Sequence, residues 1–216
     1  MVMISKKKFN QEVKRLTILQ AAKELFIEKR YSTITMDAIA ARAKITKRTL
    51  YVYFPSKLAL YIHVFDEYLQ SLYQQLVKGG KQDLPRNELI VSLFNILYEF
   101  TKKNEKFMRL YWTLDSEEFD GLIPEELMER VKVWTKAIID ESLNVLNKAK
   151  ENGYLISEYD PGVIIHLLSA MNKGIFIHTN KENKFSIANI DPDELYEVFV
   201  YLLNCGLFKK AEKEKR

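Results

Sequence analysis

The chain has 216 residues, and its 33 Lys and Arg residues against 29 Asp and Glu residues leave a formal net charge of +4. This length can bury the cores of one small and one larger domain, and the single cysteine, Cys205, excludes an intramolecular disulfide and fits a reducing cytoplasm. The sequence has no apolar leader and no uncharged run of about 18 apolar residues, so we expect neither export nor membrane spanning.

The charge is distributed unevenly along the chain. Residues 1–57 contain 13 Lys and Arg against 4 Asp and Glu, whereas residues 58–216 contain 20 against 25. A surface that binds a polyanion is therefore expected in the N-terminal part. Seven glycines and five prolines among many helix-forming residues, with no sustained period-two alternation, predict an all-α protein of about nine helices.

The first predicted element is a helix over about residues 12–29. One face of this helix carries apolar residues at three- and four-residue spacing, namely Leu16, Leu19, Ala22, Leu25 and Phe26. Residues 1–10 contain Lys6-Lys7-Lys8 without apolar periodicity, and we expect a mobile terminus there. The alternative is an ordered arm that lies along the phosphates of DNA.

Two short helical patterns follow, joined by a tight turn. Thr35 can cap the first helix, and Thr46 can cap a second helix over Lys47–Phe54. Pro55 ends the second helix, because the residue before a proline avoids the helical region. Two such helices with a three-residue turn are typical of a helix-turn-helix, which we place at about residues 35–54.

The second of these helices has an inner and an outer face. At 100° per residue, Leu50 and Phe54 share the inner face. The outer face carries Arg48, Thr49, Tyr51 and Val52, with Lys47 at the helix start and Tyr53 beside them. Arginine reads guanine in the major groove, and hydroxyl groups reach phosphates or base edges. Taken singly, each residue is more typical of a solvated face or a core edge, so the DNA-binding interpretation depends on their combination.

Residues 35–57, and especially Thr46-Lys-Arg-Thr-Leu-Tyr-Val-Tyr-Phe-Pro-Ser-Lys57, resemble the DNA-binding domain of the TetR family of transcriptional regulators. The resemblance implies a DNA-binding domain over residues 10–57 and a larger helical ligand-binding and dimerisation domain over residues 58–216. It also implies specific roles for individual side chains, with base contacts by Lys47, Arg48 and Tyr51 and phosphate contacts by Thr35, Thr49, Tyr53 and Lys57.

Two positions depart from the family's pattern. Lys44 stands in the turn where the family usually has a glycine, so either a left-handed conformation costs roughly 1–2 kcal/mol here or the turn differs. Val52 replaces what is often an aromatic residue, so one backbone contact of the family is not implied. After the motif, Ser56 can cap the next helix, whose free amides would add to the phosphate contact of Lys57.

Six further helices are predicted, at about residues 56–78, 86–103, 104–114, 125–150, 161–180 and 191–208. The first of the six would continue from the DNA-binding domain into the second domain as one rigid rod. A change at its far end could therefore move the DNA-reading helix.

The last two predicted helices, over residues 161–180 and 191–208, carry more apolar surface than one internal face requires. Symmetric operators are bound by two-fold symmetric proteins, so we expect a homodimer through these helices. The alternative is that both helices are central core. Leu203 is predicted to lie in the seam, where Leu203→Asp would release monomers.

The helices between residues 86 and 150 are rich in aromatic residues, namely Phe94, Tyr98, Phe100, Phe107, Tyr111, Trp112, Phe119 and Trp134. The resemblance implies a cavity there for a small apolar effector, although each aromatic residue alone is more typical of a plain core. No individual ligand-binding residue is predicted. His166 and His178 are interpreted as structural or surface residues.

Motifs for catalysis and metal binding are missing from the sequence. It contains no glycine-rich phosphate loop and no metal-ligand spacing, so we expect neither a cofactor nor enzymatic activity. The motif and the resemblance together predict a ligand-released repressor that binds a palindromic operator as a homodimer. The alternative is a constitutive DNA-binding architectural or assembly factor that recruits a protein partner, which would show a filled core and an exposed apolar patch beyond the dimer seam.

Overall fold

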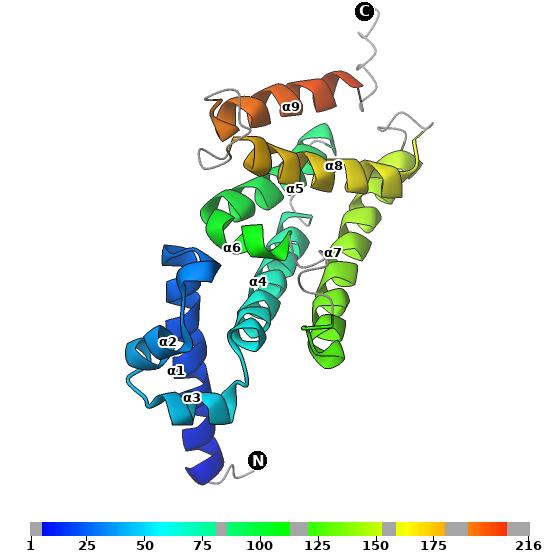
Figure 1. Ribbon diagram of the computed structural model, residues 1–216. Helices are drawn as coiled ribbons and strands as arrows, with labels where there is room; N and C mark the ends of the chain where they lie inside the picture. The colour runs from blue at the N-terminus through cyan, green and yellow to red at the C-terminus, as the bar shows by residue number, and fades with distance from the viewer. Residues whose placement is uncertain (1–5, 81–85, 113–120, 153–158, 180–189, 207–216) are drawn as a thin grey trace, which may run out of the picture. The chain divides into compact units, whose positions relative to one another are not determined.

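The computed structural model describes residues 6–80, 86–112, 121–152, 159–179 and 190–206 (Figure 1). These residues form nine α-helices and one 3-10 helix and contain no strand, which confirms the predicted all-α class. The elements are α1 Lys6–Glu28, η1 Tyr31–Thr33, α2 Met36–Arg42, α3 Lys47–Tyr53, α4 Lys57–Gly79, α5 Arg86–Lys103, α6 Glu105–Tyr111, α7 Glu125–Glu151, α8 Pro161–His178 and α9 Pro192–Gly206.

The first helix differs from its prediction. Helix α1 begins at Lys6, so the expectation of a mobile terminus up to residue 10 is wrong for residues 6–10. Apolar periodicity marks only the buried part of a helix, whereas Lys, Gln and Glu extend a helix that has already nucleated. For the same reason Leu16 is 51% exposed, although the turns after it are buried as predicted. Phe119 and the predicted end of the last helix lie outside the described residues.

Four helices begin with side-chain caps, and three of these caps, at Thr35, Thr46 and Ser56, are predicted from the sequence. The hydroxyl of Thr35 accepts a hydrogen bond from the amide of Ala38 at 3.1 Å, and that of Thr46 accepts one from Thr49 at 3.1 Å. Ser56 and Asp160 cap α4 and α8 in the same way. These caps satisfy helix amides that would otherwise lack a partner, so they fix where the helices start.

The chain divides into two compact units. The N-terminal unit comprises Met1–Gln70 and Asn104–Trp134, and the C-terminal unit comprises Ser71–Lys103 and Thr135–Arg216. Both α4 and α7 therefore contribute residues to each unit. The predicted functional division between residues 57 and 58 stays a prediction, and packing groups α6 with the helices of the helix-turn-helix.

The N-terminal unit is built on α1, which packs against α2 and α6, while α2 packs against α3. An aromatic cluster joins these helices to α4. In it, the ring centroids of Tyr61 and Phe107 are 4.6 Å apart, and Phe26 meets Tyr61 edge to face. The Tyr61 hydroxyl donates to the backbone carbonyl of Phe107 at 2.8 Å. Complete burial raises the pKa of Tyr61 well above its ordinary value, so this donor keeps its proton.

In the C-terminal unit, α5 packs against α8 and α9. Phe94 of α5 forms one core cluster with Phe199 and Leu203 of α9. Leu203 is 5% exposed within this core cluster, so its predicted place in a dimer seam is wrong. None of the described helices combines the length and apolar character needed to span a membrane.

Candidate nucleic-acid interface

The turn between α2 and α3 keeps the left-handed conformation that normally calls for glycine. Lys44 has a φ of 55°, and the amides of Lys44 and Ile45 donate to the carbonyls of Ala41 and Ala40 at 3.1 and 3.0 Å. These two bonds form a Schellman motif, which closes the C-terminus of α2. Of the two possibilities left by the sequence, the structure has the strained lysine rather than a different turn.

Helix α3 buries one side and exposes the other, as its periodicity predicts. Leu50 and Phe54 are 0% and 1% exposed, and the Phe54 ring meets His63 of α4 edge to face. On the opposite side Arg48 is exposed, Tyr51 is 47% exposed and Val52 is 77% exposed. Thr49 and Tyr53 are half-buried at the margins of this face. The outer face of α3 therefore presents one guanidinium, one phenol and one isopropyl group to solvent.

Lys47 begins the exposed side of α3 and has an acidic partner. Its ammonium lies 2.9 Å from a carboxylate oxygen of Asp37 in the first turn of α2. The hydrogen bond to Asp37 raises the pKa of Lys47, so the side chain stays charged. Both side chains are more than half exposed, and a pair of this kind is weak and easily exchanged for another partner. Asp37 was not singled out from the sequence.

Lys57 makes contacts that the sequence does not predict. Its ammonium donates to the carbonyls of Tyr31 and Ile34, both at 2.7 Å, and lies 4.1 Å from the centre of the Tyr31 ring. Partial burial lowers the pKa of Lys57. Since an ammonium has three donors, these carbonyls occupy two of them. Lys57 thus ties α4 to the link between α1 and α2, and its predicted phosphate contact stays a prediction.

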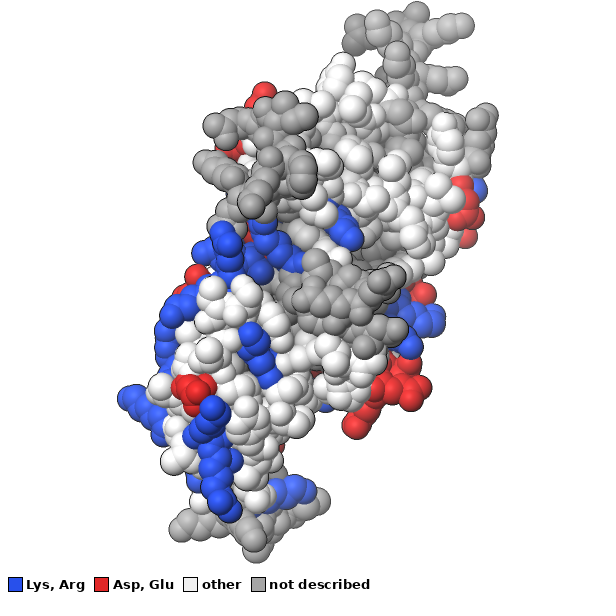
Figure 2. Space-filling model, in the orientation of Figure 1, with Lys and Arg blue, Asp and Glu red and all other residues white. Residues whose placement is uncertain are grey.

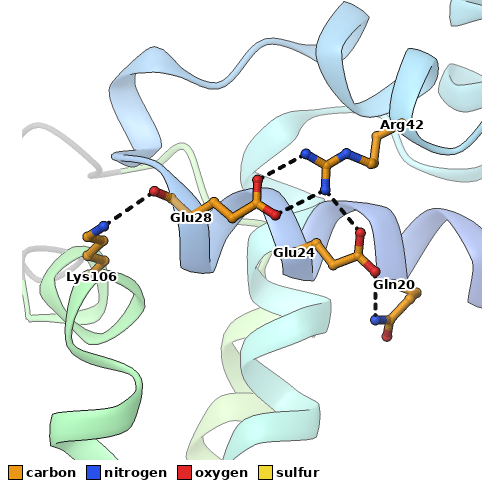
Figure 3. Close-up of polar contacts among 5 residues, drawn as sticks. All are labelled: Gln20, Glu24, Glu28, Arg42 and Lys106. Carbon is orange, nitrogen blue, oxygen red and sulfur yellow. Dashed lines mark hydrogen bonds and ion pairs between the residues drawn. The ribbon is translucent and has the colours of Figure 1, made fainter.

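An ion-pair network joins α2 of the helix-turn-helix to α1 (Figure 3). The guanidinium of Arg42 lies 3.1 Å from Glu24 and 2.9 Å from Glu28. Hydrogen bonds from Gln20 and then Arg42 lower the pKa of Glu24, and one from Arg42 lowers that of Glu28. The four-residue spacing of the two glutamates was the only available signal in the sequence, because their partner lies in another helix.

The predicted site residues fall into two groups. Thr46, Lys47, Arg48, Thr49, Tyr51 and Tyr53 lie together on α3 or at its cap, whereas Thr35 and Lys57 lie at the starts of α2 and α4. Figure 2 shows separate Lys and Arg side chains among uncharged ones in the lower part of the view, where Figure 1 places α2 and α3. Across the described ranges, no group of three or more His, Cys, Asp or Glu side chains could hold a metal ion. The arrangement therefore offers exposed cationic and hydrogen-bonding side chains on one face of α3.

The aromatic residues that the sequence predicts around one cavity divide between the two units. Phe107 belongs to the aromatic cluster of the N-terminal unit. Phe94 and Tyr98 lie in the C-terminal unit, where Tyr98 stacks on Phe176 with ring centroids 5.3 Å apart. The ring of His166 makes a 2.8 Å hydrogen bond with the carbonyl of Gly162 within its own helix, which agrees with a structural role.

The comparisons with known proteins agree with this surface. Residues 18–64 match the model of the bacterial regulatory proteins of the tetR family. The HTH-type transcriptional activator FasR of Mycolicibacterium smegmatis is 25% identical over 138 residues, which are 64% of this chain and 61% of FasR. The biofilm operon icaADBC HTH-type negative transcriptional regulator IcaR of Staphylococcus aureus is 29% identical over 126 residues, 56% of this chain and 65% of IcaR. The chain thus spans less than two thirds of the length of these relatives.

The fold of the chain also resembles that of a known transcriptional regulator. The crystal structure of the transcriptional regulator FadR from Bacillus subtilis, in complex with stearoyl-CoA, has a TM-score of 0.65 with this chain at 16% identity. The alignment covers 87% of this chain and 96% of FadR, so both units share its architecture. The match of residues 18–64, and the helix-turn-helix that they form, identify this segment with the tetR family of bacterial regulatory proteins, and the fold of the chain beyond it resembles that of FadR.

Proposed function

We propose that the protein regulates transcription by binding a palindromic DNA operator as a homodimer, and that a small apolar effector releases it. The observation that carries this proposal is the outer face of α3, where Arg48, Tyr51 and Val52 project from a helix whose opposite side is fully buried. A short rigid helix with such a face fits the major groove, where its first residues meet the base edges.

Each side chain has a role that follows from its chemistry and position. Arg48 reads guanine through its two parallel donors, and Tyr51 adds a hydroxyl to the same face. Lys47 exchanges Asp37 for the DNA, because an ion pair between two exposed side chains is weak and neutralising a phosphate releases the counterions condensed on DNA. The phosphate contacts come from Thr35, Thr49, Tyr53 and Lys57, at the helix starts and margins, and they fix the register of α3.

Support for a homodimer comes from the solvent-facing sides of α8 and α9. Several large apolar side chains are exposed there, namely Val163, Leu167 and Met171 on α8 and Val198, Tyr201 and Leu202 on α9. A soluble protein rarely exposes so many apolar groups on two adjacent helices unless another surface covers them. A second copy of the chain would bury both faces at once in a two-fold arrangement, and would bring two α3 helices to one operator.

The effector is proposed to be apolar because FadR, whose fold this chain shares, is described in complex with stearoyl-CoA. Release requires only that the effector bind more tightly to the form with low DNA affinity, by a coupling free energy of about 1–3 kcal/mol. Repression is the simpler outcome, since an occupied operator blocks transcription directly. IcaR is a negative regulator and FasR is an activator, and both directions use the same DNA contacts.

Fluorescence anisotropy with a labelled duplex from the region upstream of the protein's own gene tests the DNA-binding proposal. We expect salt-dependent binding that Arg48→Ala weakens. The matched control is Lys136→Ala, which removes one positive charge from an exposed side chain of α7. Equal affinities of Arg48→Ala and the wild type would contradict the proposed role of α3.

The effector proposal needs a separate measurement. A ligand at 100 times its Kd stabilises the folded protein by about 2.7 kcal/mol, so stearoyl-CoA should raise the melting temperature and lower the DNA affinity together. A series of acyl-CoA chain lengths would show whether the apolar chain carries the affinity. A melting temperature unchanged across that series would exclude acyl thioesters as effectors.

A further inference from the structure

Helix α1 extends well beyond the core that it supports. From Ile18 onward it is anchored by buried residues, among them Leu19, Ala22 and Phe26. No residue from Lys8 to Thr17 is buried. The first three turns of α1 therefore form a helical extension without a core beneath it, and Figure 1 shows this end of α1 projecting past α3 within the N-terminal unit.

The face of α1 that packs on the core changes character where the extension begins. Residues recurring at three- and four-residue spacing share one side of a helix, so Lys8, Gln11 and Arg15 continue the line of Leu19, Ala22 and Phe26. Lys14 likewise continues the line of the buried residues Ile18, Ala21 and Leu25. One continuous side of α1 is thus apolar over the helix-turn-helix and basic beyond it.

Arg15 marks the edge at which this change occurs. Its guanidinium carbon lies 5.7 Å from the centre of the Phe54 ring, and Phe54 is the C-cap of α3. The guanidinium also lies 3.5 Å from Nδ1 of His63 in α4. The basic side of α1 consequently starts at the C-terminal end of the proposed recognition helix. From there to Lys6, nine residues at 1.5 Å each carry the extension about 13 Å outward.

The charge of the extension is almost entirely positive. Residues 6–15 contain five Lys and Arg and one acidic residue, Glu12, which pairs with Arg15 at 3.6 Å. Such a rod can lie along a polyanion without moving any other part of the unit. Duplex DNA carries one negative charge per roughly 1.7 Å of its axis, and its major groove is about 12 Å wide. An extension of about 13 Å beside a helix in that groove is therefore long enough to reach from the groove to the phosphates that border it.

We infer that the first three turns of α1 form a second DNA-binding element, which contacts the phosphates beside the base pairs read by α3 through Lys8 and Lys14. The inference rests on the proposed function, because it requires α3 to sit in the major groove. Phosphate contacts carry no sequence information, so this element adds affinity and salt dependence and leaves base preference to α3.

The test compares three proteins on a labelled duplex of random sequence over a range of salt concentrations. The double variant Lys8→Gln/Lys14→Gln removes two exposed charges, and Gln preserves the helix because its helix propensity is close to that of Lys. The control Lys132→Gln/Lys136→Gln removes two charges from exposed side chains of α7. We expect the double variant to flatten the slope of log affinity against log salt by about 0.9 per lysine in each protomer, and the control to match the wild type.

The charge-reversed variant Lys8→Glu/Lys14→Glu should weaken binding further, while all variants keep the wild-type base preference in enrichment from a random pool. If both variants of Lys8 and Lys14 keep the wild-type salt slope, the inference is overturned and the proposed function still stands. A changed base preference would also overturn the inference. The inference would also be overturned if the variants of Lys8 and Lys14 lost binding to phosphatidylserine vesicles and kept the wild-type salt slope on DNA. The extension would then bind a membrane surface. If the wild type binds no duplex at low salt, the proposed function and the inference fall together.

Discussion

Lys44 lowers the folding stability of the helix-turn-helix through its backbone conformation. Its φ of 55° is required by the two hydrogen bonds that end α2 and aim α3. A residue with a side chain loses roughly 1–2 kcal/mol in this conformation, whereas glycine loses only its greater freedom in the unfolded chain, roughly 0.5–1 kcal/mol. The strain persists because the packing of Leu50 and Phe54 holds the two helices in place.

Lys44→Gly should therefore stabilise the protein by about 0.5–1 kcal/mol. For a chain of this size, that corresponds to a rise of roughly 2 °C in melting temperature, measurable by calorimetry. Lys44→Ala is the control, because it removes the same charge and keeps the strained conformation. A gain in Lys44→Ala equal to that in Lys44→Gly would show that charge rather than backbone geometry sets the stability here.

Arg48 and Lys57 should differ in how they affect DNA binding. Arg48→Ala should cost roughly 1–3 kcal/mol of binding free energy and relax preference at one base position, because a bidentate contact to a base edge is lost. Competition binding with single-base variants of the selected site measures both quantities. Unchanged discrimination at every position in Arg48→Ala would contradict its role as a base reader.

Lys57→Met should instead lower both folding stability and affinity for all duplexes alike. The carbonyls of Tyr31 and Ile34 lose a charged donor, which costs roughly 1–3 kcal/mol, and the third donor no longer reaches a phosphate. Thermal unfolding and the salt slope of binding report the two effects separately. A change in base preference would show that Lys57 does more than hold the helix and a phosphate.

At the scale of the helices, the ion pairs of Arg42 with Glu24 and Glu28 hold α2 against α1. The pKa values of Glu24 and Glu28 are lower in the folded protein than the ordinary value of 4.5. A lowered folded pKa stabilises the protein above the unfolded pKa, and this contribution is lost as the pH falls through the folded value. The network therefore supports the fold at neutral pH and fails in acid.

Arg42→Met should destabilise the protein at pH 7, where it leaves two neighbouring carboxylates without their shared partner. The difference from the wild type should shrink as the pH falls below about 4.5, because both glutamates become neutral. Urea unfolding midpoints at several pH values measure this convergence. A difference that stays constant between pH 7 and pH 3 would show that Arg42 acts through packing rather than charge.

How far the sequence predicts each element depends on how local its determinants are. The caps at Thr35 and Thr46 were predictable because a cap and its amide lie three residues apart. The partners of Arg42 and Lys57 were not, since they lie in other elements whose placement depends on the whole fold. The start of α1 was missed because exposed turns leave no apolar periodicity.

At the scale of the whole molecule, adjacent apolar residues of α9 serve different purposes. Leu202 is 57% exposed, whereas Leu203 is 5% exposed beside Phe94 and Phe199. A helical pattern in the sequence shows that both are apolar and cannot say which side meets the same protomer and which is left for a partner. The proposed seam therefore lies on the exposed side of α9 and the adjacent exposed side of α8.

Leu202→Glu should yield folded monomers with reduced operator affinity, because the substitution places charges in the proposed seam and leaves the core intact. Analytical ultracentrifugation gives the mass, and calorimetry confirms that the fold survives. Leu203→Asp should instead lower the melting temperature strongly, since it buries a charge among apolar side chains. A Leu202→Glu dimer with wild-type affinity would exclude this seam.

The most direct test of the account is selection of bound duplexes from a random pool by the purified wild-type protein at low ionic strength. We expect enrichment of a two-fold symmetric sequence whose half-sites lie about 34–36 Å apart along one face of the duplex. Arg48→Ala should lose preference at the same position of each half-site. Failure to enrich any duplex, or enrichment that Arg48→Ala leaves unaltered, would contradict the claim that α3 reads DNA.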